Sequence, residues 1–88
     1  MKEFTFIVKN KSGMHARPSG RFVTVAKEFE SDITVMKNNM EASGKRLLSL
    51  MALGASYGTE LCVKIEGNDE EKAFEALKKA VDEIFGEE

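Results

Sequence analysis

Four short stretches of the chain alternate apolar with more polar residues, and this period of two predicts four β-strands. The Asn38-Asn39 pair suits a tight hairpin between the second and third strands, because asparagine tolerates a positive φ. Since each strand has one apolar face and one more polar face, we expect an antiparallel sheet with one covered and one open face. The strands are expected at residues 4–8, 33–37, 40–43 and 60–66.

Two of the segments between these strands repeat their apolar residues with a helical period. A stripe of Phe22, Ala26 and Phe29 predicts a helix that begins near residue 16 and ends before Glu30. A shorter and unusually apolar helix is expected within residues 44–54, where Gly54 provides a left-handed stop.

A third helix is expected near the end of the chain, where apolar residues again form one stripe. Asn68 fits its N-cap, Glu71 completes a capping box, and Gly86 fits the C′ position. The element order is therefore β-α-β-β-α-β-α. The predicted fold class is α+β, with a four-stranded antiparallel sheet and three helices on one face. With 88 residues we expect a single domain, residues 1–88.

Composition narrows the possible partners and surroundings. The formal net charge is -2 with the two signs interspersed, so we expect no nucleic-acid partner. No apolar run is long enough to span a bilayer, so we expect no direct membrane insertion. The first residues do not resemble a signal peptide, and the lone Cys62 forms no internal disulfide, which favours a cytoplasmic protein. A monomer is the default expectation.

The only histidine and the only proline of the chain lie close together, as His15 and Pro18. Proline suits the first turn of a helix, so His15 lies where a helix begins. The free N–H groups of Ala16 and Arg17, together with the positive end of the helix, form an anion site. The same positive end favours the neutral, nucleophilic imidazole. Because the Arg17 guanidinium binds phosphate oxygens well, a phosphoryl group on His15 is the chemistry that these residues favour.

Other chemistries lack the residues that they require. One histidine and one distant cysteine do not make a zinc site, so no metal is expected. Cys62 lies in the middle of a predicted strand, where nothing lowers its pKa enough for a catalytic pair with His15. The chain contains no glycine-rich nucleotide loop, so a self-contained ATP-using enzyme is not expected.

The short helix carries more apolar residues than one buried face can hold. Leu47, Leu50 and Met51 share a face, whereas Leu48 lies off it. Some of these side chains are therefore expected to stay exposed and to form a docking patch for another protein, with Ser49 and Ala52 as small neighbours.

These features together resemble the HPr family, the histidine-containing phosphocarriers of the bacterial phosphoenolpyruvate:sugar phosphotransferase system. The likeness covers the whole chain, and its most specific part is the run of residues 12–18 around His15. The resemblance implies an open-faced β-sandwich. It also implies that His15 accepts a phosphoryl group on Nδ1 from phospho-Enzyme I, passes it to the A domains of sugar-specific Enzymes II, and uses Arg17 to bind phosphate.

The resemblance also implies a docking surface and one departure from the family. The residues expected to contact partners are Ser12, Ala16, Gly20, Arg21, Leu47, Leu48, Ser49, Met51 and Ala52. In members from low-GC Gram-positive bacteria a regulatory serine opens the short helix, and many other members also have serine there. Arg46 occupies that position here and has no hydroxyl to phosphorylate. Regulation through this serine is therefore not expected, and Arg46 adds positive charge beside the docking surface.

Two alternatives remain at this point. A paralogue in a nitrogen-related or regulatory phosphorelay would share the same histidine. A binding module would dock through the Leu47–Met51 patch without using His15 chemically.

Overall fold

Four antiparallel strands and three helices make up the computed structural model, which describes residues 1–86. The sheet order is β1-β4-β2-β3, so β1 and β3 are the edge strands. The elements are β1 (Lys2–Ile7), α1 (Ala16–Ala26), β2 (Asp32–Lys37), β3 (Met40–Ser43), α2 (Leu47–Ala52), β4 (Glu60–Glu66) and α3 (Glu70–Phe85). The predicted fold class and element order are confirmed.

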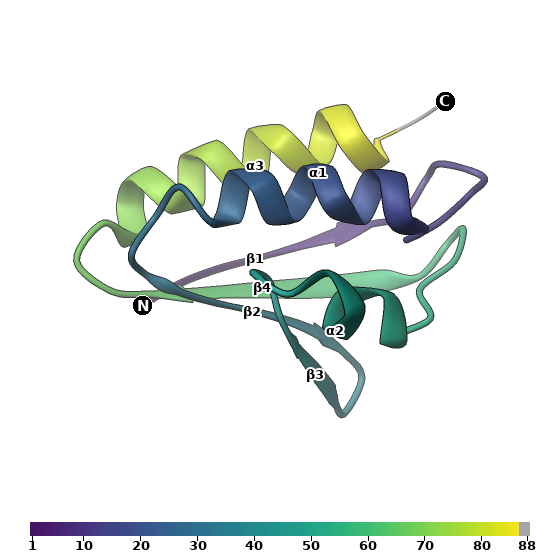
Figure 1. The fold of residues 1–88 in the computed structure, drawn as a ribbon, viewed down its shortest axis with the longest axis horizontal. Coiled ribbons are helices and arrows are strands. Elements are labelled where there is room, and N and C mark those ends of the chain that lie inside the picture. Colours follow the sequence, from purple (N-terminus) through teal and green to yellow (C-terminus); the bar gives the residue numbers. More distant parts are fainter. Residues whose placement is uncertain (87–88) are drawn as a thin grey trace.

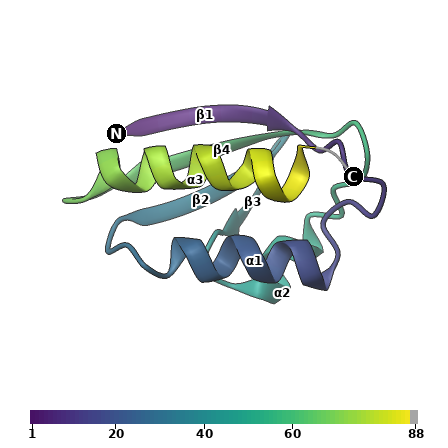
Figure 2. The ribbon, with the colours of Figure 1, turned by 90° about the horizontal axis from the view of Figure 1, so that it is seen from above.

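The helices leave one face of the sheet open. Helices α1 and α3 lie side by side along the other face, and α2 packs beside α1 near β3 (Figures 1 and 2). Residues alternate strictly along β4, where Leu61, Val63 and Ile65 are fully buried and the residues between them are more exposed. This alternation directs one set of side chains to the helices and the other to the open face.

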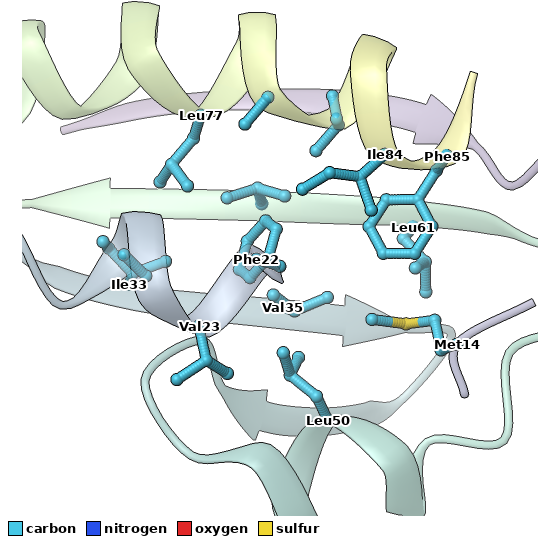
Figure 3. Packing of buried hydrophobic residues seen from close by; sticks show 14 of the residues in the cluster. Met14, Phe22, Val23, Ile33, Val35, Leu50, Leu61, Leu77, Ile84 and Phe85 are labelled. Atoms are coloured by element: carbon cyan, nitrogen blue, oxygen red, sulfur yellow. The ribbon is translucent and has the colours of Figure 1, made fainter. Parts of the chain in front are cut away.

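The core joins all three helices to the inner face of the sheet (Figure 3). Apolar stripes on the helices supply much of it, as their spacing predicts. Met14, which lies outside any helix or strand, is only 6% exposed and reaches into the same cluster. The largest fully buried apolar side chains are Phe22, Phe85, Leu50, Leu61, Ile65, Leu77, Val8, Val35 and Val63.

Two turn predictions are confirmed by the backbone angles. Asn38 adopts a φ of 55° in the hairpin between β2 and β3. Gly54 adopts a φ of 67° directly after α2, where the Lys37 ammonium also donates to the Leu53 carbonyl at 3.0 Å. The Lys37 ammonium thus satisfies the Leu53 carbonyl at the C-terminal end of α2, where the helix dipole is negative.

The predicted ends of the last helix are wrong. The N-cap is Asp69, not Asn68, and the Glu70 carboxylate rather than that of Glu71 accepts a hydrogen bond from the backbone of Gly67 at 3.1 Å. Gly86 keeps a helical φ of -71° and is the C-cap residue, so it provides no left-handed stop. Helix α1 ends at Ala26, before the end of the apolar stripe that predicted it. Phe29, the last residue of that stripe, packs on the core from outside the helix.

The Asp69 carboxylate joins two connections that lie far apart in the sequence. It accepts hydrogen bonds from the backbone N–H groups of Glu30 at 2.8 Å and Ser31 at 3.0 Å, and from the Ser31 hydroxyl. These bonds, that of the Ser31 hydroxyl first among them, hold the pKa of Asp69 below its ordinary value. The carboxylate therefore links the segment after α1 to the start of α3.

We predict that Asp69→Asn lowers the thermal unfolding midpoint most strongly near neutral pH. Because the Asp69 pKa is lowered by folding, its stabilising effect is complete above the unfolded pKa of about 4 and is lost as pH falls through the folded value. Midpoints of the wild type and the variant, measured across acidic and neutral pH, should therefore converge in acid. Glu75→Gln, which neutralises an exposed carboxylate of α3, is the control. A gap between wild type and Asp69→Asn that does not change with pH would contradict the prediction.

Candidate functional site

His15 is the N-cap residue of α1 and is exposed. Its backbone is extended, with φ -74° and ψ 176°, and its carbonyl accepts the first helical hydrogen bond from Ser19 at 3.0 Å. Pro18 has no N–H, so the N–H groups of Ala16 and Arg17 are the two donors of the first turn that no helical carbonyl satisfies. His15 thus directly precedes two backbone donors that the helix leaves unsatisfied, and its side chain and that of Arg17 are both exposed.

The backbone before His15 is held by the segment that follows α2. The Met14 N–H donates to the Ala55 carbonyl at 3.1 Å. Gly13 has a φ of 64°, and a Cβ atom there would lie 2.7 Å from the same carbonyl oxygen. Only glycine meets both requirements at this point, which explains why the chain needs Gly13. This close approach places His15 near the end of α2.

Arg17 and Arg21 line a hollow of about 210 Å³ at the start of α1. Ser12, Pro18 and Glu83 of α3 are among the other residues that line it. The two guanidinium groups, one helical turn apart, give this end of α1 a positive charge that attracts phosphate oxygens.

Four of the residues expected to contact partners lie in the first half of α1 or in the loop just before it. Ser12, Ala16 and Arg21 are exposed, and Gly20 is half-buried. A Cβ atom on Gly20 would meet nothing within 4 Å, so this glycine keeps the helix surface flat beside His15.

Helix α2 presents the rest of the expected docking surface. Leu50 is fully buried, whereas Leu48 is 80% exposed and Leu47 is 37% exposed. Ser49 and Met51 are half-buried, and Ala52 is exposed. The expectation that this helix leaves apolar side chains exposed is confirmed. We call Leu47, Leu48, Ser49, Met51 and Ala52 the α2 patch.

Arg46 is the N-cap residue of α2 and is exposed, in the position that the resemblance assigns to it. Within residues 1–86 its side chain makes no capping hydrogen bond to the helix. A guanidinium cannot accept from an N–H group, so Arg46 leaves the first turn of α2 without the cap that serine would supply.

Cys62 lies on the open face of the sheet, paired across the strands with Thr5 and Met36. Burial, followed by its hydrogen bond to the Glu3 carboxylate, raises the pKa of the Cys62 thiol. The thiol and His15 therefore belong to opposite sides of the sheet and do not form a catalytic pair.

Two residues in the loops at this end of the sheet carry features that the sequence pattern does not indicate clearly. Asn10, whose polar neighbours are typical of an exposed loop, is only 4% exposed and binds the backbone of Gly13 through its side-chain amide. Tyr57, in the loop after α2, is 67% exposed. A lone aromatic between serine and glycine was the available signal for Tyr57, whereas nothing in the local pattern marks Asn10 as buried.

Within residues 1–86, no helix is long and apolar enough to cross a membrane. Over the same residues, no three histidine, cysteine, aspartate or glutamate side chains gather closely enough to hold a metal ion.

Comparison with known proteins gives a consistent result. The family model described as "PTS HPr component phosphorylation site" matches residues 2–83. Phosphocarrier protein HPr of Neisseria meningitidis serogroup A is 40% identical over 78 residues, which cover 89% of this chain and 88% of that protein. The crystal structure of HPr-C-His from Thermoanaerobacter tengcongensis aligns with a TM-score of 0.92 and 44% identity, over 100% of this chain and 99% of that one. The HPr dimer from the same organism aligns with a TM-score of 0.76 and 43% identity, over 98% and 99%.

We predict that Gly13→Ala destabilises the fold by at least about 1 kcal/mol, because an L side chain in the left-handed region costs about 1–2 kcal/mol per residue. The added Cβ would also press on the Ala55 carbonyl. Urea unfolding measures the change. Gly20→Ala is the matched control and should stabilise α1 by roughly 0.5–1 kcal/mol, since it adds a methyl group to an open helical position. Equal urea midpoints for Gly13→Ala and the wild type would contradict the prediction. They would show that the backbone near Ala55 moves aside without a loss of stability.

Proposed function

Because this chain belongs to the HPr family of the phosphotransferase system, we propose that His15 is the residue that carries the phosphoryl group. The observation that supports this assignment most directly is the position of His15 at the N-cap of α1. There its exposed imidazole is beside the unsatisfied N–H groups of Ala16 and Arg17. In the proposed role Enzyme I is the donor and the A domains of Enzymes II are the acceptors.

The transfer is an in-line displacement at phosphorus. A neutral imidazole nitrogen of His15 attacks the phosphorus atom, a new N–P bond forms, and the bond to the donor breaks with its electron pair leaving on the donor. Negative charge on the equatorial oxygens is stabilised by the two first-turn N–H groups and by the Arg17 guanidinium. The same step in the opposite sense passes the group to the acceptor, so the chain acts as a carrier without turnover of its own and needs no cofactor.

Both partners would dock on the α2 patch and on the start of α1. The patch is apolar and exposed, Arg46 directly precedes it, and Arg17 and Arg21 lie at the start of α1, a distribution of positive charge that favours partners with acidic surfaces. Since Arg46 has no hydroxyl, we propose that no serine switch operates at the start of α2. We also propose that the chain works in the cytoplasm as a monomer, an oligomeric state that sedimentation would test against the dimer described for the Thermoanaerobacter tengcongensis protein.

The 80% exposure of Leu48 also favours a second candidate, a module that acts by docking alone. In that case the partner would bind equally well with and without a functional His15. A nitrogen-related phosphorelay remains a third candidate, and it would differ only in the donor that phosphorylates His15.

We predict that incubation with Enzyme I, Mg²⁺ and phosphoenolpyruvate raises the intact mass by one phosphoryl group in an acid-labile form. His15→Ala should abolish this gain because it removes the only imidazole of the chain. Cys62→Ala is the control and should be phosphorylated like the wild type. An unmodified wild type beside an active Enzyme I would overturn the proposed function, and a modified His15→Ala would place the phosphoryl group elsewhere.

We predict that Leu48→Asp raises the KM for phosphorylation by Enzyme I about 5- to 30-fold, which corresponds to the 1–2 kcal/mol of an important contact residue. The fold should be preserved because Leu48 is 80% exposed. Steady-state phosphoryl transfer at varied carrier concentration measures KM. Ile7→Asp, at an exposed apolar position on β1, is the matched control. An unchanged KM for Leu48→Asp would remove the α2 patch from the docking surface.

A further inference from the structure

Asn10 is a buried polar residue in the loop between β1 and α1. It is 4% exposed, although it lies between Lys9 and Lys11, which are both exposed. A side-chain amide is costly to bury unless hydrogen bonds replace the water that it loses. The contacts of Asn10 therefore show what the buried amide does.

Asn10 binds both polar backbone groups of Gly13. Its own carbonyl accepts a hydrogen bond from the Gly13 N–H at 3.2 Å. Its side-chain Nδ2 donates to the Gly13 carbonyl at 2.9 Å and to the Ser12 hydroxyl oxygen at 3.1 Å. The side chain thus closes the turn that the backbone begins, in the manner of asparagine side chains in tight turns.

These bonds fix the peptide group that precedes His15. The Gly13–Met14 peptide is held on its carbonyl side by Asn10 Nδ2 and on its N–H side by the Ala55 carbonyl, 3.1 Å away. Rotation of this peptide plane would break both bonds. On the other side of His15, its own carbonyl is bound by the Ser19 N–H. The backbone is therefore clamped before and after the imidazole.

The side-chain amide of Asn10 does not form all the hydrogen bonds of which it is capable. Asn10 Oδ1 is buried and has no hydrogen-bond partner within residues 1–86. A buried acceptor without a donor costs stability. The two bonds of Nδ2 offset this cost, since an apolar side chain would leave the Gly13 carbonyl without its donor and the peptide before His15 without its restraint.

We propose that Asn10 is a positioning residue for phosphoryl transfer at His15. It acts through the Gly13–Met14 peptide, which it orients so that the imidazole and the N–H groups of Ala16 and Arg17 face one incoming phosphoryl group. The proposal rests on the proposed function of His15. Asn10 itself touches no reacting atom.

Two variants of Asn10 and one control test the proposal. Asn10→Asp keeps the shape and the oxygen but replaces the donating NH₂ by an acceptor that faces the Gly13 carbonyl. Asn10→Ala removes the side chain and tests the same loss without a new charge. Asn39→Ala, at an exposed asparagine of the β2–β3 hairpin, is the matched control.

Both Asn10 variants should lower kcat for transfer from phospho-Enzyme I by about 10- to 100-fold, the range expected when a reacting group is misplaced by up to 1 Å. KM should stay near the wild-type value, because the α2 patch is unchanged. Hydrogen exchange at the Met14 amide should become faster relative to the amides of β4, which report global stability. Asn39→Ala should match the wild type in every readout.

Three results would overturn the proposal. One is a wild-type kcat in either folded Asn10 variant, and another is a loss that appears in KM alone. The third is Met14 exchange that accelerates only in step with the β4 amides, since this would show a general loss of stability. A wild type that accepts no phosphoryl group would instead refute the proposed function, and the positioning role with it.

Discussion

Each strand of the sheet buries only one face, and the position of every other element follows from that constraint. Helices α1 and α3 must lie on the same side, so the connections gather at the two ends of the sheet (Figure 1). At one end, Val8 exchanges backbone hydrogen bonds with Gly58 and Thr59, Lys9 donates to the Phe85 carbonyl, and Met14 donates to the Ala55 carbonyl. Two segments distant in sequence, residues 55–59 and the end of α3, thereby support the loop that carries His15.

The two ends of the sheet are held by different chemistry. At the end away from His15, the Asp69 carboxylate holds the segment after α1 through charge-assisted bonds to Glu30 and Ser31. At the His15 end, neutral hydrogen bonds from Asn10 and Met14 hold the loop. The bonds from Asn10 and Met14 thus fix the backbone without adding a negative charge next to His15, where the proposed phosphoryl group would bring its own.

The strands, the hairpin and the exposure of Leu48 could be predicted because each depends on neighbours in the sequence. The cap of α3 could not. Asp69 is drawn into the N-cap by partners 38 and 39 residues away, and no local pattern contains them. The same holds for Asn10, whose polar side chain is typical of an exposed loop but becomes buried because α3 and the segment after α2 close around it. Local rules thus located His15 and Arg17 but not the residues that hold them in place.

A carrier that must meet two partners cannot enclose its reactive group in a pocket, and this requirement explains the contrast around His15. The imidazole is exposed, while Met14 directly before it is 6% exposed and Ser19, whose N–H donates the first helical hydrogen bond, is fully buried. Orientation therefore has to come from the backbone beneath the ring. Since a backbone clamped on both sides of His15 loses little freedom when a partner docks, the same geometry serves donor and acceptor. The docked partner would enclose the reacting groups, and the loop between β1 and α1 would orient His15 toward them.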